Sequence, residues 1–220
     1  MAVPGEHHPA FEEYCETIFE LREDDLDVIQ ARIADRLRVS RPSVSEMIKR
    51  MSDESLIEVA GGKITLTVTG EELAVRVVRR HRIAERFITD ILGLSWSLAH
   101  REAGRWEHVM SHEVETAMSS LLGEPTTCPH GNPIPGSGYT PPSAKKLSEL
   151  SSGQEFTVSR IPEELEFTPG MLEFLETSHL VPGSHGTVQV GAEAGDMTVL
   201  IDGTSVTVDS FATVRILVTI

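Results

Sequence analysis

Apolar residues recur every three or four positions through the first half of the chain, a spacing typical of amphipathic helices. This pattern predicts helices over residues 10–22 and 27–38. A third helix is expected after Ser40, because serine is a good N-cap and Pro42 is tolerated in a first turn. Alternating polar and apolar residues around Gly61 then predict a two-stranded hairpin. Helix, turn, helix and glycine-tipped hairpin together predict a winged helix-turn-helix.

Helical spacing continues beyond the hairpin. Thr69, with Glu72 three residues later, has the form of a capping box and predicts a long helix over residues 70–91. Two further helices are expected over residues 95–109 and 111–122, the second ended by a glycine. The middle of the chain is therefore expected to be a helical unit.

Residues 124–144 interrupt this pattern with six prolines and three glycines, a density that excludes helix and strand and predicts a linker. Beyond it, short β-rich segments are divided by Gly, Pro and Asp, and one helical segment is expected at residues 169–178. This pattern of short strands separated by turn residues predicts a small β-barrel. The β-rich segments are residues 156–161, 185–191, 196–203 and 206–220.

The expected fold class is mainly α with a C-terminal β-barrel. A chain of 220 residues is long enough for two or three small domains. We expect a winged helix-turn-helix at 1–70, a helical unit at 71–123, a proline-rich linker at 124–146 and a barrel at 147–220.

The charge of the chain is unevenly distributed. A formal net charge of −15 argues against a protein that coats nucleic acid non-specifically. Residues 27–50, however, hold six basic residues against three acidic ones, whereas residues 110–220 hold four against fourteen. The positive charge thus lies where the winged helix-turn-helix is expected.

The chain has no features of a membrane or secreted protein. No run of about 18 apolar residues is present, so no transmembrane helix is expected. The N-terminus is acidic and has no apolar signal core. Cys15 and Cys128 are too few for a disulfide framework. We therefore expect a soluble cytoplasmic protein with no membrane partner.

The third predicted helix has the side chains that a recognition helix needs. Such a helix must present small polar or charged groups to base edges in the major groove, with basic groups reaching phosphates. An alternative is a helical pair that only packs, in which Ser40 is no more than a cap. Glu46 is unusual near phosphates, where it could accept from cytosine or repel wrong sequences. The candidate DNA-binding residues are Ser40, Arg41, Pro42, Ser43, Ser45, Glu46, Lys49 and Arg50.

Acidic and histidine residues recur at helical spacing in three predicted helices, where residues three or four apart share a face. Carboxylate and imidazole groups suit manganese, iron or zinc. Each pair alone has a simpler explanation, a solvated helix face or a buried histidine, but their joint placement favours metal binding. The pairs are Glu13 with Glu16, His81 with Glu85, and Glu107 with His108, to which His100 adds an imidazole.

A zinc protease helix is excluded by spacing. Its HExxH motif requires a glutamate directly after the first of two histidines that are four residues apart. His108 and His112 are four apart, but Val109 follows the first. The second histidine is followed by Glu113, and no histidine stands at Thr116.

Residues 79–94, 99–115 and 131–136 closely resemble the diphtheria toxin repressor family of metal-dependent transcription regulators. The first two segments read RRHRIAERFITDILGL and AHREAGRWEHVMSHEVE, and the third reads GNPIPG. The resemblance implies a winged helix, dimerisation helices, a proline-rich linker and an SH3-like or FeoA-like domain. It also implies a homodimer whose metal-loaded form binds double-stranded palindromic operator DNA.

The resemblance further implies two metal sites. Glu13 stands where the iron-responsive branch has a methionine, so this chain is similar to the manganese-responsive branch. The expected cofactor is Mn²⁺ or Fe²⁺, for which Zn²⁺ or Co²⁺ could substitute in vitro. One site matches Glu13, Glu16, Glu107 and His108; the other matches His81, Glu85 and His100, closed by Cys128 and His130.

Two departures from the family pattern stand out. Gly104 lies where relatives usually have a cysteine or glutamate ligand, so the first site could use water or recruit Cys15 or His81. The ligands of the barrel also match poorly. Thr168 and Met171 stand near the family's ligand positions, and Glu164 or Glu166 could substitute.

Three functions remain open from these residues. The first is a metal-dependent transcriptional repressor that is not an enzyme and takes no small organic substrate. The second is a metalloenzyme that uses the Glu/His cluster, with Glu107 or Glu113 as base, although no motif supplies a substrate pocket. The third is an adaptor whose barrel binds a peptide.

Overall fold

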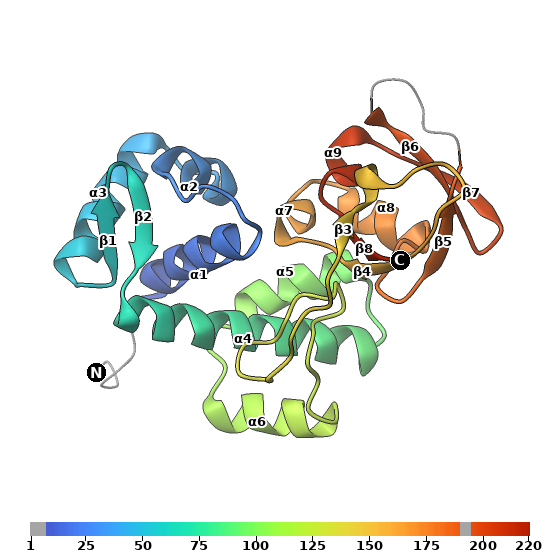
Figure 1. The fold of residues 1–220 in the computed structure, drawn as a ribbon. Helices are drawn as coiled ribbons and strands as arrows, with labels where there is room; N and C mark the ends of the chain where they lie inside the picture. Colours follow the sequence, from blue (N-terminus) through green and yellow to red (C-terminus); the bar gives the residue numbers. More distant parts are fainter. Residues whose placement is uncertain (1–7, 190–194) are drawn as a thin grey trace.

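The computed structural model describes residues 8–189 and 195–220 (Figure 1). Residues 190 and 191 of one predicted β-rich segment lie outside these ranges. Figure 1 shows the first three helices and a small hairpin at one end, a long helix beneath them, and a strand-rich unit at the other end. The expected fold class, mainly α with an SH3-like unit at the C-terminus, is confirmed, but the strands of the described residues form a six-stranded sheet that does not close into the expected barrel.

The first helices and the hairpin form the winged-helix unit, as predicted. The Ser40 hydroxyl caps the third helix by accepting from the Ser43 amide at 3.2 Å. At the hairpin tip, Gly61 and Gly62 have φ of 59° and 82°, which glycine adopts without strain. An apolar cluster fills the unit and includes Leu73 and Ala74 of the long helix that follows. Its elements are α1 (Pro9–Glu23), α2 (Gln30–Leu37), α3 (Arg41–Asp53), β1 (Ile57–Ala60) and β2 (Lys63–Leu66).

The helical unit is built on one long helix, α4, which extends from the winged-helix unit toward the C-terminal unit (Figure 1). The predicted capping box is wrong by two residues, because Thr67 and not Thr69 caps α4. The Thr67 hydroxyl accepts from the Gly70 amide at 3.2 Å. A Cβ at Gly70 would lie 2.0 Å from the carbonyl oxygen of Leu56, so this turn packs directly on the backbone that precedes the hairpin. The helices are α4 (Val68–Asp90), α5 (Trp96–Trp106) and α6 (His112–Leu121).

The C-terminal unit is a six-stranded antiparallel sheet in the order β3-β8-β4-β5-β6-β7. Its apolar core includes Trp96 of α5, so the sheet packs onto the helical unit. The predicted helix at residues 169–178 is confirmed as α8, but three short helical turns were not predicted. The elements are β3 (Lys145–Lys146), η1 (Leu147–Glu149), β4 (Glu155–Arg160), α7 (Glu163–Glu166), α8 (Met171–Thr177), β5 (His185–Val188), β6 (Met197–Ile201), β7 (Thr204–Val208), α9 (Ser210–Thr213) and β8 (Leu217–Thr219).

The proline-rich segment 124–144 contains no helix or strand, apart from one isolated bridge, yet it is tightly held. Arginines of α4 donate to its carbonyl oxygens: Arg82 to Pro133 at 2.5 Å and Arg86 to Cys128 at 3.0 Å. The segment thus runs along α4 and can present its own side chains to that helix.

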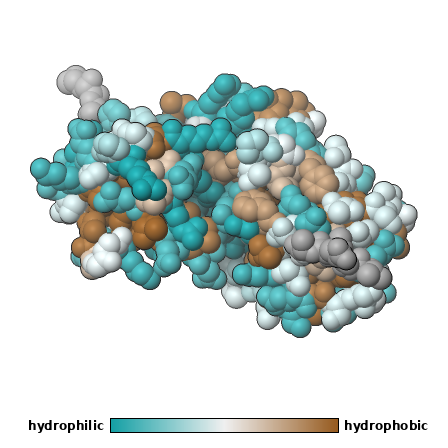
Figure 2. All heavy atoms as spheres, turned by 90° about the horizontal axis from the view of Figure 1, so that it is seen from above, coloured by the Kyte–Doolittle hydropathy of each residue, from teal (hydrophilic) through white to brown (hydrophobic). Residues whose placement is uncertain are grey.

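The surface seen from above is mostly hydrophilic, and its hydrophobic patches are interrupted by polar side chains (Figure 2). None of the helices in the described ranges combines the length and the hydropathy that a membrane span requires.

Candidate metal centres

His81 of α4 stands between two groups of acidic and imidazole side chains. Its Nδ1 lies 2.5 Å from Oε2 of Glu107 and 4.0 Å from Oε1 of Glu16. Its Nε2 lies 3.2 Å from Oε1 of Glu85 and 3.3 Å from Nδ1 of His100. The ring is buried, so both nitrogens face ligand-type groups rather than bulk water.

The first centre joins α1 to the end of α5 through α4. The ligand-type atoms of Glu16, His81 and Glu107 all lie within 4.8 Å of one another. His108 adds an imidazole whose Nε2 lies 3.1 Å from Oε1 of Glu107. A cavity of about 200 Å³ opens onto this group, and Glu13 lines it. We name Glu16, His81, Glu107 and His108 the first centre.

Glu12, which the sequence interpretation missed, faces His108. Its Oε2 lies 2.8 Å from Nδ1 of His108, and the residue is only 5% exposed. The neighbouring Glu13, which was expected beside His108, is exposed at the cavity. The signal was present in the spacing, because Glu12 and Glu16 are four residues apart and therefore share one face of α1.

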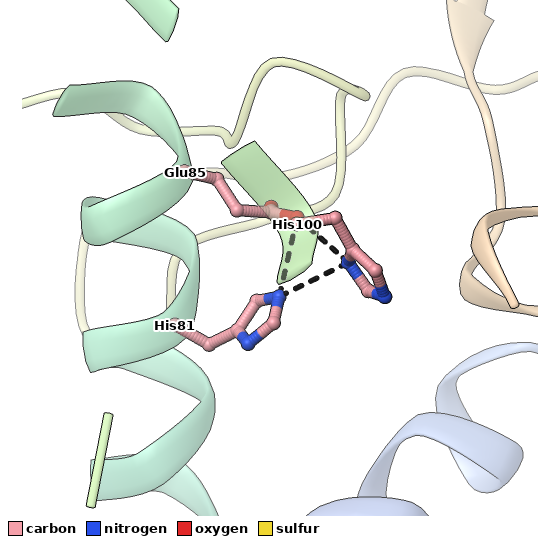
Figure 3. Close-up of side chains that lie close together, drawn as sticks. All are labelled: His81, Glu85 and His100. Carbon is pink, nitrogen blue, oxygen red and sulfur yellow. Dashed lines mark hydrogen bonds and ion pairs between the residues drawn. The ribbon is translucent and has the colours of Figure 1, made fainter. Parts of the chain in front are cut away.

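The second centre brings together α4, α5, the proline-rich segment and α7. Figure 3 shows Glu85 and His81 projecting from α4 toward His100. Glu85 also groups with Cys128 and His130, with ligand-type atoms within 4.8 Å of one another. The structure thus brings together the residues expected at this site. We name Glu85, His100, Cys128, His130 and Glu166 the second centre.

The C-terminal unit contributes Glu166 to this centre. Its Oε2 lies 2.9 Å from Nδ1 of His130 and 3.3 Å from Nδ1 of His100. Glu164 instead pairs with Arg215 at 2.7 Å, away from the cluster. The sequence did not decide which of the two glutamates is a ligand, because the short helix α7 was not predicted. This helix turns Glu166 toward the second centre and Glu164 away from it.

The other residues near the family's barrel positions have structural roles. The Thr168 hydroxyl donates to the backbone carbonyl of Glu164 at 3.0 Å. Met171 is buried in the apolar core of the C-terminal unit. Cys15 is likewise buried in the core of the winged-helix unit. Burial, with the charge of Glu12, raises the pKa of the Cys15 thiol to about 12 and makes it a poor ligand.

Charge holds the imidazoles in their protonated form. Burial lowers the pKa of His81, but the carboxylates of Glu85 and Glu107 outweigh this and hold it well above its usual value. Burial likewise opposes protonation of His100, yet hydrogen bonds to Glu166 and Glu85 raise its pKa to about 9. Each imidazolium therefore supplies positive charge to the surrounding carboxylates.

The pKa values of Glu16 and Glu166 are shifted in opposite directions. Burial and the neighbouring Glu107 raise the pKa of Glu16 well above its usual value. Burial also opposes ionisation of Glu166, but the charge of His130 dominates and lowers its pKa to about 2. Ionised Glu16 is thus costly beside Glu107 in this buried site, which favours a proton or a metal cation there.

The donor atoms fit a divalent cation. Buried polar atoms normally have hydrogen-bond partners, and unpaired ones are costly. Several buried atoms of both centres have none, and carboxylate, imidazole and thiol groups are the donors that bind first-row divalent metals. Oε1 of Glu16 and Nε2 of His130 are unpartnered. Oε2 of Glu85 and Oε2 of Glu166 make no regular hydrogen bond but face Nδ1 of His130, at 3.5 and 2.9 Å.

Gly104 leaves open space beside the first centre. It lines the same cavity, and a Cβ built on it would meet no atom within 4 Å. The absent side chain is therefore not compensated by a neighbouring group packed into its place.

Helix α3 exposes the residues expected to contact DNA. Val44, Ile48 and Met51 are buried against the winged-helix core, which turns the opposite face outward. The Arg50 guanidinium lies over the Phe11 ring at 5.3 Å, so it is partly held by α1. The exposed residues are Ser40, Arg41, Pro42, Ser43, Ser45, Glu46, Lys49 and Arg50.

Two family descriptions match most of the first 136 residues. Residues 8–63 match the "Iron dependent repressor, N-terminal DNA binding domain". Residues 67–136 match the "Iron dependent repressor, metal binding and dimerisation domain". These ranges coincide with the winged-helix unit and with the helical unit plus most of the proline-rich segment.

Relatives extend the match over nearly the whole chain. The iron-dependent repressor IdeR of Mycobacterium leprae is 38% identical over 204 residues, covering 87% of this chain and 88% of that protein. The diphtheria toxin repressor of Corynebacterium diphtheriae is 48% identical over 126 residues, or 57% of this chain and 56% of that protein.

Solved structures are similar as well. A manganese-dependent transcriptional repressor in complex with manganese has a TM-score of 0.84 and 32% identity, covering 94% of this chain and 98% of that one. The IdeR structure from T. acidophilum has a TM-score of 0.77 and 30% identity, covering 95% and 97%. With both family descriptions matched and the fold shared along its length, the chain belongs to the diphtheria toxin repressor family of iron- and manganese-dependent transcriptional repressors.

Proposed function

We propose that this chain acts as a homodimer that represses divalent-metal homeostasis genes, and that Mn²⁺ or Fe²⁺ promotes its binding to a palindromic operator. The observation that supports this is the position of His81, which lies within hydrogen-bond or ligand distance of both centres. The first centre includes Glu16 of α1, in the winged-helix unit, and Glu107 at the end of α5. Occupancy of the centre would therefore affect how the DNA-binding unit sits on the helical unit.

The proposed ligands come from both centres, with Glu13 added at the mouth of the first. A bound divalent cation would supply the positive charge that lets these carboxylates remain ionised side by side. The same proposal keeps the expected boundaries of winged helix (1–70), helical unit (71–123), linker (124–146) and barrel (147–220). The proposed ligands are Glu13, Glu16, His81, Glu85, His100, Glu107, His108, Cys128, His130 and Glu166.

The chain's own residues would couple metal binding at the first centre to the position of α1. Glu16 and Glu107 belong to different units, and their like charges repel when both are ionised. His108, just after α5, keeps α1 close through Glu12 at 2.8 Å. In the unloaded protein this polar contact thus lies beside a repulsive pair, while ion pairs such as Arg22 with Glu71 also hold α1 to α4. Loading would remove the repulsion and strengthen the attachment.

The donors favour manganese or iron at the first centre, which contains only carboxylate and imidazole groups. Cys128 makes the second centre softer and better suited to zinc or cobalt. A similar solved structure, ScaR with bound Zn²⁺, has a TM-score of 0.77 and 27% identity. We therefore expect Zn²⁺ and Co²⁺ to bind in vitro as well.

The DNA contacts are proposed for α3. In a dimer, two such helices enter the major groove about 34–36 Å apart, one turn of DNA. A small shift of α1 against α4 would change that spacing and so decide binding. Arg41 and the serines would face base edges, while Lys49 and Arg50 would face phosphates. We assign the chain to the cytoplasm, where such DNA lies, and assign no catalytic role to the Glu/His cluster.

Selection of a duplex from a randomised pool by the Mn²⁺-treated protein would test this function. Fluorescence anisotropy on the selected duplex would then be recorded with Mn²⁺, with Fe²⁺ under anaerobic conditions, and with a chelator. We expect tight binding with either metal and loss of binding with the chelator. Equal binding in all conditions, or no selected sequence, would contradict the proposal.

A further inference from the structure

The winged-helix unit and the C-terminal unit do not share an apolar core. Among the described residues, their two buried clusters have no member in common. The units meet instead through polar and aromatic contacts of Arg160 and of residues 163–167, which are α7 and the residue after it. Figure 1 shows α7 on the side of the C-terminal unit that faces α1 and α2. Polar interfaces of this kind allow relative motion unless specific contacts hold them.

One contact holds the end of α1. Oδ2 of Asp24 accepts from the Glu164 amide at 3.2 Å, and its Oδ1 pairs with Arg160 at 2.5 Å. The Asp24 side chain is only 4% exposed, so its charge depends on these partners. Arg160 also pairs with Glu23 at 3.1 Å. The last turn of α1 is therefore attached to the C-terminal unit.

A second contact lies deeper and includes α4. The guanidinium of Arg82 is fully buried. One of its nitrogens lies 2.6 Å from Oε2 of Glu23 and 2.9 Å from Oε1 of Glu163. This single side chain therefore joins α1, α4 and α7. A buried ion-pair network of this kind is sensitive to the loss of any one partner.

The third contact reaches α2, the helix before the recognition helix. The Arg36 guanidinium lies 4.0 Å from the centroid of the Phe167 ring, a distance at which the cation is attracted to the ring face. The same ring packs edge-on against His100 of the second centre, with centroids 5.0 Å apart. Phe167 thus touches the winged-helix unit on one side and the second centre on the other.

We propose that residues 163–167 are a positioning segment that couples the second centre to the orientation of α1 and α2. Glu166 faces the second centre from the same helical turn that carries Glu163, the Glu164 amide and Phe167. A shift of Glu166 must therefore move the contacts that hold the winged-helix unit. A movement of the winged-helix unit must likewise shift Glu166. This rests on the proposed function, because it assigns the second centre a part in setting DNA affinity.

Two substitutions with matched controls test the segment in the full-length protein. Asp24→Asn removes the charge that faces Arg160 with almost no change of shape, and Asp25→Asn makes the same change at an exposed neighbour. Phe167→Leu removes the ring under Arg36. Phe211→Leu is its control, because both phenylalanines are 39% exposed and Phe211 lies 3.7 Å under Arg215 within the C-terminal unit.

The readouts are amide hydrogen exchange over residues 20–37 and the Mn²⁺ midpoint for binding the selected duplex. We expect Asp24→Asn and Phe167→Leu to accelerate exchange there. We also expect them to raise the midpoint at least about fivefold, the lower end of typical coupling between sites. Affinity at saturating Mn²⁺ should stay close to that of the parent. A merely destabilising change would instead lower the bound fraction without moving the midpoint.

Both controls should match the parent in exchange and midpoint. The proposal is overturned if Asp24→Asn and Phe167→Leu behave like Asp25→Asn and Phe211→Leu. If Phe167→Leu does not fold, the comparison of the nearly isosteric Asp24→Asn with Asp25→Asn decides whether the proposal holds. Failure of the proposed function would look different, because the parent itself would then bind no duplex in a metal-dependent way. The exchange measurement would still report whether the segment holds α1 and α2.

Discussion

Nδ1 of His108 lies 2.8 Å from Oε2 of Glu12, although the two residues are 96 positions apart in the sequence. An ionised carboxylate can only accept, so Nδ1 carries the proton in this pair. Nε2 then faces Glu107 at 3.1 Å, and its lone pair is available to the first centre when His108 is neutral. Carboxylates that hold a ligand histidine in this way fix both its tautomer and its orientation. Glu12 thus prepares His108 for metal binding.

Glu12→Gln should weaken Mn²⁺ binding at the first centre about tenfold, because loss of such an orienting carboxylate typically costs 10- to 100-fold in metal affinity. Isothermal titration with Mn²⁺ measures this directly. Glu72→Gln, an exposed glutamate of α4, is the control and should match the parent. Unchanged affinity in Glu12→Gln would show that His108 needs no orienting carboxylate.

Removal of a first-centre ligand should abolish metal-activated DNA binding while leaving the dimer intact. His108→Ala and Glu107→Ala remove donors from the helical unit, and Glu16→Ala removes one from α1. The three are joined only through the centre, so we expect one shared phenotype at Mn²⁺ levels that saturate the parent. Light scattering checks the dimer and anisotropy checks DNA binding.

Glu13→Ala belongs in the same series, because its exposed carboxylate lines the cavity of the first centre. A smaller loss than in Glu16→Ala is expected from that exposure. If Glu13→Ala and Glu16→Ala both keep the parent's metal dependence while His108→Ala loses it, α1 is not bridged by the metal.

Metal affinity should rise with pH between about 6 and 9. The pKa of His100 is about 9, and that of His81 lies well above 6.5, so both imidazoles carry protons at neutral pH. A metal needs the neutral ring, so binding must release these protons. Titration calorimetry in buffers of different ionisation enthalpy should report at least about one proton released at pH 7. A pH-independent affinity with no proton release would contradict this picture.

The stability of the metal-free protein should change in the opposite sense. Because the folded pKa of His100 is raised from 6.5 to about 9, its contribution is fully present below pH 6.5 and is lost as the pH rises through 9. Urea unfolding of chelator-treated protein across this range is expected to show a falling midpoint. Mn²⁺ should offset the fall.

Cys128 should bind Co²⁺ as a thiolate. Burial raises the pKa of this thiol, so without a metal it stays protonated, whereas a coordinated thiol is deprotonated. Co²⁺ should therefore produce a near-ultraviolet thiolate-to-metal charge-transfer band. The band is expected to disappear in Cys128→Ser and to persist in Cys15→Ala, whose thiol lies in an apolar core. A band that survives in Cys128→Ser would assign the thiolate elsewhere.

Lys49→Ala should weaken binding to all duplexes similarly and lower the salt dependence of affinity. Each phosphate contact contributes a slope of about 0.9 in a plot of log affinity against log salt concentration. Lys49 is exposed on α3, so one such contact is expected to be lost. Lys145→Ala, an exposed lysine of the C-terminal sheet, should leave the slope unchanged. An altered sequence preference in Lys49→Ala would instead indicate a base contact.

The sequence alone determined the elements whose signals are local. Helical spacing, the Ser40 cap and the Gly61-Gly62 tip place the winged helix correctly, because they depend on residues a few positions apart. The approximate limits of α4, α5 and α6 followed from the same spacing. The cap of α4 was misplaced by two residues because Gly70 is fixed by tertiary contact with the backbone of Leu56.

Only the tertiary structure decided which side chains meet. Glu12 and Glu13 are adjacent residues of the same type, but the packing of α1 turns Glu12 toward His108 and leaves Glu13 exposed. Glu164 and Glu166 were equally possible until the turn of α7 pointed Glu166 at His130. The position of His81 between both centres depends on the approach of α1, α5 and α7 to α4. Such contacts join residues far apart in the chain, and no periodicity within a single helix specifies them.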